Sequence, residues 1–183
     1  MKKKFLAGLA IGFLMFGMVA VAMWTTSPAE ATPITYSASA ATAAGIQAMV
    51  EAFRTDLGFL NANVAGSFGS GRREINWDGV PDALSAPNLL PGNFFNVNSP
   101  RGVVFSTQGT GFQVSANVAN ASGTPIEFGN LNLSYPGQFD TFSAQRLLTA
   151  IGSNIVDVSF FLPGSTTAAL TRGFGFELTG YQT

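Results

Sequence analysis

The chain has 183 residues, of which 46% are hydrophobic, 10% are charged and 21 are Gly, and it contains neither Cys nor His. A chain of this length can form one domain of ordinary size with its own hydrophobic core. The missing residue types exclude disulfide bonds, thiolate and imidazole metal sites, a Cys nucleophile and a Ser-His-Asp triad.

Residues 1–31 have the organisation of a secretory signal peptide. Residues 2–4 are Lys, residues 5–24 form an uncharged apolar run, and Pro28 stands shortly before Ala29-Glu30-Ala31. Signal peptidase recognises small residues at the first and third of these last positions, so we expect cleavage after Ala31. The alternative is a retained membrane anchor, because about 20 apolar residues can just span a bilayer. The pattern favours export, with membrane contact only through this segment before cleavage.

Removal of this segment changes the charge of the chain. Residues 32–183 lack three Lys and one Glu of the full chain, which leaves six Arg against nine carboxylates and a net charge of −3. The Arg residues are scattered, apart from the pair Arg72-Arg73. Nucleic-acid binding depends on a clustered positive field that displaces counterions from phosphates. The charge pattern therefore excludes a nucleic-acid partner.

Residues 37–58 have the spacing of one amphipathic helix, with Gly58 suited to the C-cap. The apolar residues that share one helical face are Ile46, Met49, Val50, Phe53 and Leu57. We expect this face to cover the body that follows, the alternative being a helix that binds a partner. The predicted organisation is a signal peptide at 1–31, an N-terminal segment with the helix at 32–60 and a β domain at 61–183.

The part of the chain after Gly58 has the pattern of a strand-rich domain, because short runs of β-branched and aromatic residues alternate with Gly, Pro and Asn turns. Apolar residues occupy alternate positions in the runs at 155–162 and 172–179, as in strands with one buried face. The pattern favours an all-β fold, an antiparallel β-sandwich of jelly-roll type preceded by the helix. The expected strands are 72–77, 102–107, 111–118, 130–134, 145–151, 155–162 and 172–179.

The segment 71–82 is the most distinctive part of the chain, since it contains two Arg, three carboxylates and one of the two Trp. Asn76, Asp78 and Asp82 carry oxygen donors of the kind that Ca²⁺ prefers, and Gly79 permits a tight turn between them. These three residues are the predicted calcium ligands. The alternative is a strand that ends in an Asp-Gly turn, with its Arg and carboxylate side chains paired across a sheet.

Two aromatic residues, Trp77 and Tyr135, are flanked by polar turn residues. Aromatic rings in such positions can form stacking platforms for sugar rings, so we predict that both bind a ligand. The alternative is that each ring is partly buried in the ordinary way.

A hydrolase that uses two carboxylates needs both in one cleft at a defined separation. The candidates are Glu74, Asp78, Asp82, Asp140, Asp157 and Glu177, but no motif singles out a pair. Residues 32–183 contain no Lys, so a Ser-Lys mechanism is excluded as well. Catalysis is therefore the third reading of the chain, behind two non-catalytic ones.

Three stretches together carry a resemblance: GRREINWDGVPD (71–82), FFNVNSPRGVVFSTQGTGFQVSA (94–116) and IGSNIVDVSFFLPGSTTAALTRGFGFEL (151–178). They resemble a group of uncharacterised exported bacterial proteins, some of which carry PEP-CTERM-type sorting tails. The resemblance implies an exported β-sandwich of unknown activity. The Val-Pro-Glu-Pro sequence and the apolar tail of that group are missing from this chain. We hypothesise that the chain is C-terminally truncated relative to them.

The first functional hypothesis is an exported, non-catalytic domain that binds a surface ligand such as a glycan, with structural calcium. The second is a structural or assembly component of the cell envelope or extracellular matrix, with another envelope protein as partner. An exposed aromatic cluster at Trp77 and Tyr135 would favour the first. A long unpaired edge strand with a flat apolar face would favour the second.

Overall fold

The computed structural model describes residues 32–180, so the predicted signal peptide at 1–31 lies outside the described residues. The described helices and strands all belong to one of two compact units, Thr35–Thr183. No helix in the described part combines the length and the apolar composition that crossing a membrane requires.

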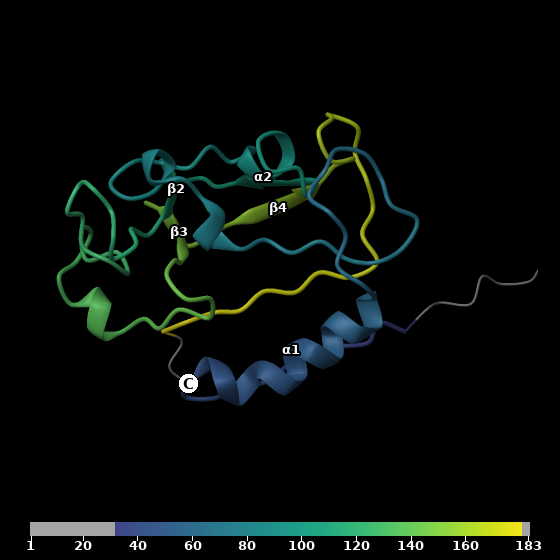
Figure 1. The fold of residues 1–183 in the computed structure, drawn as a ribbon, viewed down its shortest axis with the longest axis horizontal. Helices are drawn as coiled ribbons and strands as arrows, with labels where there is room; N and C mark the ends of the chain where they lie inside the picture. Colours follow the sequence, from purple (N-terminus) through teal and green to yellow (C-terminus); the bar gives the residue numbers. More distant parts are fainter. Residues whose placement is uncertain (1–31, 181–183) are drawn as a thin grey trace, which may run out of the picture. The chain divides into compact units, whose positions relative to one another are not determined.

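The helices and strands of this unit are short, and turns and irregular segments separate them (Figure 1). In chain order they are α1 (Ala43–Leu57), the 3-10 helices η1 (Trp77–Gly79) and η2 (Asp82–Leu84), α2 (Phe94–Val97), β1 (Val103–Ser106), β2 (Gly111–Val114), the 3-10 helix η3 (Tyr135–Gly137), β3 (Leu148–Ile151) and β4 (Asp157–Phe160). Strand β1 pairs with β4 and β2 pairs with β3, both antiparallel, so the unit contains two two-stranded sheets.

The prediction of an all-β antiparallel sandwich is wrong, because the described residues form a small mixed fold with two α-helices and four short strands. Four expected strands are confirmed at reduced length, as β1, β2, β3 and β4. The other three expected strands, at 72–77, 130–134 and 172–179, are not strands in the structure.

The two sheets are successive parts of one bent antiparallel ribbon. Val103 lies opposite Phe160 in one sheet and Gly111 lies opposite Ile151 in the other, so the register differs by a single residue. Gly109 lies at the bend, where an added Cβ would collide with the carbonyl oxygen of Ile151. The ribbon can bend at this point because glycine lets the two backbones approach closely.

The hydrophobic core lies on one face of the ribbon, and half of its buried residues are Phe. Phe105 of β1 and Phe112 of β2 lie with their ring centroids 5.9 Å apart, and Trp77 packs edge-on against Phe95 at 5.3 Å. The buried members of the cluster are Val80, Leu90, Phe94, Phe95, Val103, Phe105, Phe112 and Val114. Burial of side chains of this size stabilises a fold by about 1.5–3 kcal/mol each.

The predicted helix is confirmed as α1, with Gly58 as its C-cap at φ +93°. The amide of Gly58 donates to the carbonyl oxygens of Arg54 and Thr55, which satisfies two groups at the helix end. None of the helix residues is fully buried. The helix does pack on the body that follows, because Phe53 and Leu57 lie against Gly173 and Gly175. It contributes nothing to the core, because the core residues and those packed against them come from Ile75 onward.

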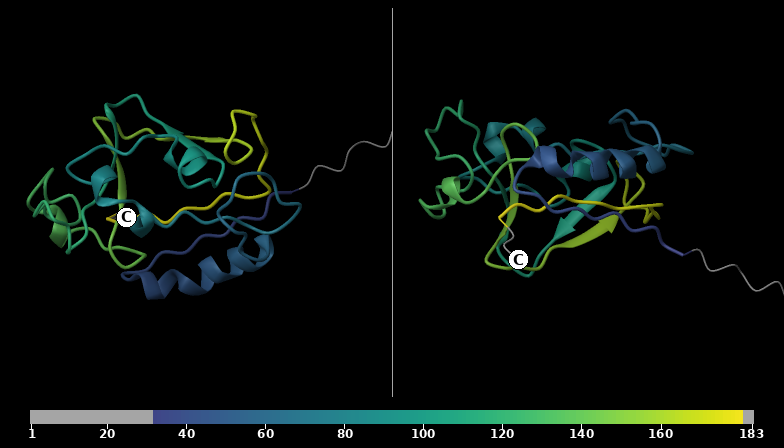
Figure 2. Two further views of the ribbon diagram at one scale, coloured as in Figure 1. Left: turned by 45° about the horizontal axis from the view of Figure 1, so that its top comes forward. Right: turned by 90° about the horizontal axis from the view of Figure 1, so that it is seen from below.

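The segment 172–179 is extended but forms no strand ladder with any described residue (Figure 1, yellow). A Cβ on Gly175 would come within 2.7 Å of the Phe53 ring, and one on Gly173 within 2.9 Å of Leu57. The glycine side of this segment thus contacts α1 (Figure 2). The strand that alternation predicted here is therefore wrong, because a strand needs a partner that bonds its backbone groups.

The Arg73 side chain bonds backbone carbonyl groups of neighbouring irregular segments. Arg73, inside the expected strand 72–77, donates to the carbonyl oxygens of Ala62, Val64, Gly66 and Pro100. A cation–π contact holds its guanidinium 4.8 Å from the Phe68 ring centroid. Charge-assisted hydrogen bonds of this kind can fix an irregular segment as firmly as a ladder does.

Candidate functional site

The predicted calcium ligands Asn76 and Asp78 both bond backbone amides. Asn76 precedes η1, and its Oδ1 accepts a hydrogen bond from the amide of Asp78 at 2.9 Å. One carboxylate oxygen of Asp78 accepts from the amide of Gln145 at 3.1 Å. These bonds cap the 3-10 helix and attach it to the segment that leads into β3. The alternative to calcium was a strand ending in an Asp-Gly turn with Arg and carboxylate side chains paired across a sheet. The structure has no strand at 72–77, and Arg72 pairs with Glu74 two residues away.

The third predicted ligand, Asp82, forms an ion pair with Arg146. The Arg146 side chain is only 2% exposed, and its Nη1 also donates to the carbonyl oxygen of Ser115 at 3.2 Å. Asn117 Nδ2 approaches the same oxygen of Asp82 at 3.4 Å. Asp82 is therefore the counterion of a buried cation. Among residues 32–180 no group of three or more carboxylates could hold a metal ion, and the calcium site stays a prediction.

The two predicted stacking residues lie in different 3-10 helices and have different neighbours. Trp77 of η1 packs on Phe95 and Phe105, which places its ring against the core. Tyr135 of η3 packs on Phe139 with ring centroids 5.0 Å apart. No aromatic contact within the described part of the chain joins Trp77 to Tyr135. Their role in ligand binding stays a prediction.

The carboxylate candidates for hydrolysis take part in ion pairs or lie on separate elements. Glu74 accepts from Arg54 at 2.9 Å and from Arg72 at 2.6 Å, so two cations neutralise it. Asp157 lies in β4 and is exposed, while the amide of Asp140 is bonded to the side chain of Thr179. Glu177 lies in the extended C-terminal segment.

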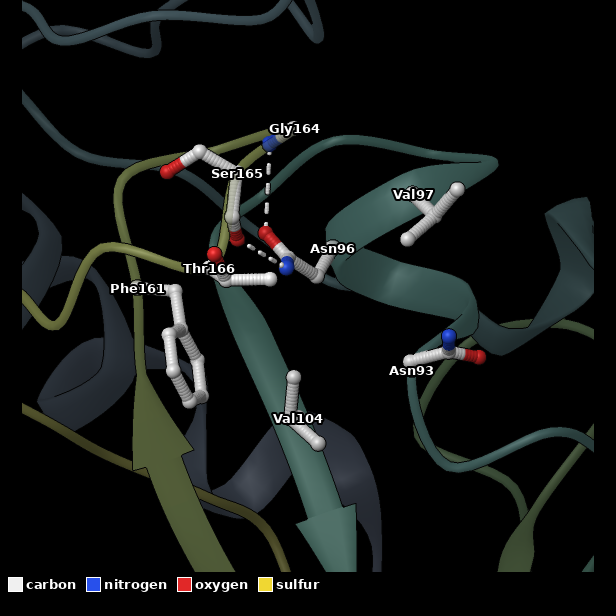
Figure 3. Close-up of a pocket in the computed structure, with 8 residues that line it drawn as sticks. All are labelled: Asn93, Asn96, Val97, Val104, Phe161, Gly164, Ser165 and Thr166. Atoms are coloured by element: carbon white, nitrogen blue, oxygen red, sulfur yellow. Dashed lines mark hydrogen bonds between the residues drawn. The ribbon is translucent and has the colours of Figure 1, made fainter.

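One pocket of about 230 Å³ lies between α2 and the loop that follows β4 (Figure 3). Its lining includes the apolar side chains of Val97, Val104 and Phe161 and the polar side chains of Asn93 and Thr166. No side chain in this lining is charged, so the lining residues cannot supply a general acid or base.

Asn96 holds the two walls of this pocket together. Its side chain is nearly buried, at 5% exposed for the residue, and Nδ2 donates to the carbonyl oxygen of Ser165 at 2.8 Å. Its Oδ1 accepts from the amide of Gly164 at 3.1 Å, as Figure 3 shows. Asn96 is not among the site residues that the sequence predicted. A polar side chain inside the apolar run 94–97 was the signal that could have found it.

A second candidate is the surface that we call the C-terminal apolar strip, made of Phe174, Phe176 and Leu178. These side chains alternate along the extended segment and are 49%, 66% and 72% exposed. Phe174 packs on Phe160 of β4 and on Phe176, with ring centroids 5.6 and 5.7 Å apart. The strip therefore continues the apolar surface of the ribbon, and large apolar side chains that adjoin one another on a surface are typical of interaction sites.

Comparisons with protein-family models, with curated proteins and with solved structures found no match to this chain. The resemblance to exported bacterial proteins stays a prediction. The function must be argued from the pocket, the strip and the sequence itself.

Proposed function

We propose that this protein is an exported, non-catalytic component of the cell envelope or extracellular matrix that assembles with further copies of itself. The observation that carries the proposal is the C-terminal apolar strip. It lies on an extended segment whose backbone groups form no ladder within the described residues. The organisation of residues 1–31 supports export.

An extended segment that forms no backbone ladder and has one apolar face is a template for strand addition. In an antiparallel pair of identical segments related by a two-fold axis, Gly175 can lie opposite Gly175 of the second copy. Phe174 then lies opposite Phe176 of the second copy, so four rings meet on one face. Cross-strand aromatic pairs contribute about 0.2–1 kcal/mol each beyond alanine pairs.

The opposite face of the segment is already in contact with α1, because Gly173 and Gly175 lie against Phe53 and Leu57. The second copy would therefore meet the outward face and the backbone edge, and α1 would keep its contacts. This division of the two faces distinguishes the strip from an apolar segment that simply lies loose on the surface.

The test is the oligomeric state of residues 32–183, measured by sedimentation velocity over a range of concentrations from about 1 to 100 μM. We expect concentration-dependent dimers or larger assemblies. Phe176→Lys should make the protein monomeric, because a charge on an edge strand opposes strand addition. Leu133→Lys is the matched control, since Leu133 is 88% exposed and lies outside the strip. A wild-type protein that stays monomeric throughout would overturn the proposal.

A further inference from the structure

The pocket between α2 and the loop after β4 has features that the assembly proposal does not use. It is lined by Asn93, Asn96, Val97, Val104, Phe161, Gly164, Ser165 and Thr166. From its size, its lining and its fixed walls we infer that this pocket binds a single neutral sugar residue.

The volume sets the size of the ligand. Pockets for drug-sized molecules have volumes of roughly 300–1,000 Å³, and this one, at about 230 Å³, falls below that range. One six-membered ring with its substituents is the scale of ligand that such a space suits. A longer oligosaccharide would contact the pocket through one residue, with the rest of the chain outside.

The lining sets the charge of the ligand. No Arg, Lys, Asp or Glu is among the lining residues, so a phosphate or carboxylate entering the pocket would lose water without gaining a counterion. The apolar part, with the Phe161 ring and the Val104 side chain, offers a surface for the C–H face of a ring. A hydroxylated ring that is apolar on one face and polar at its edge fits both properties.

Two polar side chains of the lining can form hydrogen bonds with the hydroxyl groups of such a ring. The Asn93 amide and the Thr166 hydroxyl form no side-chain hydrogen bond with another described residue, while both belong to the lining. An amide side chain offers two donors and an acceptor, and a hydroxyl can donate or accept a hydrogen bond. Together they suit sugar hydroxyls, which also both donate and accept. Figure 3 shows Thr166 and Asn93 on opposite sides of the apolar side chain of Val104.

The walls are held in place before a ligand arrives. Asn96 bonds Ser165 and Gly164 through its side chain, and its own carbonyl oxygen accepts from the Gly164 amide at 2.9 Å. These three bonds join α2 to a loop about 70 residues later in the chain. A pocket that is already formed loses less conformational entropy on binding than one that must order its loops.

The experiment is saturation-transfer-difference NMR on the protein of residues 32–183, with glucose, galactose and N-acetylglucosamine as separate probes. Glucuronate tests the exclusion of charge, and cyclohexanol tests whether an apolar ring alone suffices. We expect saturation of the ring protons of at least one neutral sugar, and a weaker signal from glucuronate and from cyclohexanol.

The decisive variant is Thr166→Val, which removes one hydroxyl and keeps the shape of the side chain. It should raise the dissociation constant of the bound sugar roughly two- to tenfold, the effect of one lost hydrogen bond. Thr167→Val is the matched control, because Thr167 is the next residue and is not part of the lining. An unchanged affinity in Thr166→Val, a cyclohexanol signal equal to that of the sugars, or no signal from any sugar would overturn the inference.

Discussion

Arg146 provides the sharpest test of how this fold is held together, because it is a buried cation with few partners. Its side chain is 2% exposed, whereas that of Asp82, its counterion, is 50% exposed. Nη1 donates to the carbonyl oxygen of Ser115, a residue with no exposed surface. The perturbation is Arg146→Met, which keeps most of the length of the side chain and removes the charge and the donors.

The magnitude follows from what the substitution leaves behind. The Ser115 carbonyl loses the side-chain donor that the structure gives it, and an unsatisfied buried acceptor costs about 1–3 kcal/mol. Asp82 also loses its cation. Half of its side chain is exposed to water, so the free-energy cost of leaving this carboxylate unpaired lies at the low end of the range for a broken buried ion pair. Together they predict a loss of about 2–4 kcal/mol. For a chain of this size that corresponds to a fall in Tm of roughly 4–16 °C.

The assay is thermal unfolding of residues 32–183 followed by circular dichroism and checked by denaturant titration. Arg172→Met is the matched control, since Arg172 is exposed and forms no ion pair with a described residue. We expect the control to change the free energy of unfolding by less than about 0.5 kcal/mol. Equal melting midpoints for the two variants would refute the reasoning, because the buried contacts of Arg146 would then contribute nothing measurable to the free energy of unfolding.

Three further outcomes are expected. Burial, with a smaller contribution from Asp140, raises the pKa of Glu127, so the folded state prefers the protonated carboxyl. The favourable contribution of the protonated Glu127 carboxyl to the stability of the fold is present below the usual pKa of Glu. It is lost as the pH rises through the pKa of Glu127 in the folded state. Glu127→Gln should therefore be more stable than wild type at neutral pH in thermal melts, with the difference vanishing in mild acid. One oxygen each of Asn76, Asp78 and Asp82 accepts a protein hydrogen bond, so we expect millimolar calcium to leave Tm unchanged relative to EDTA. A rise that Asp78→Ala abolishes would instead support the predicted metal site. We expect export with cleavage after Ala31, so the mature protein should begin at Thr32, and mass spectrometry that finds residues 1–31 still attached would contradict this expectation.

Local pattern predicted those features of the fold that depend on nearest neighbours in the chain. The apolar spacing from Ile46 to Leu57 predicted α1, and Gly58 predicted its end, because helix periodicity and capping are properties of a few consecutive residues. The same holds for β1, β2, β3 and β4, whose positions the runs of β-branched and aromatic residues indicated. The strand predicted at 172–179 is not among them, because no described segment pairs with it in a ladder.

Tertiary structure alone decided which extended segments found a partner. Residues 72–77 and 172–179 have the composition of strands, but Arg73 bonds four distant carbonyl groups and Gly173 and Gly175 lie against α1. A ladder forms only where two backbones meet in register, and no local pattern encodes that meeting. Four strands that pair in twos cannot make the two facing sheets of a sandwich.

The candidate sites divide in the same way. The sequence by itself determined which residue types exist, so the absence of Cys and His excludes whole classes of chemistry whatever the fold. It also identified the oxygen donors at 76–82 but not their partners, since Gln145 and Arg146 lie more than sixty residues away. The pocket and the C-terminal apolar strip arise only when α2 meets the loop after β4 and when the glycine side of 172–179 meets α1. Both depend on contacts between segments far apart in the chain, and such contacts are fixed by the packing of the whole unit.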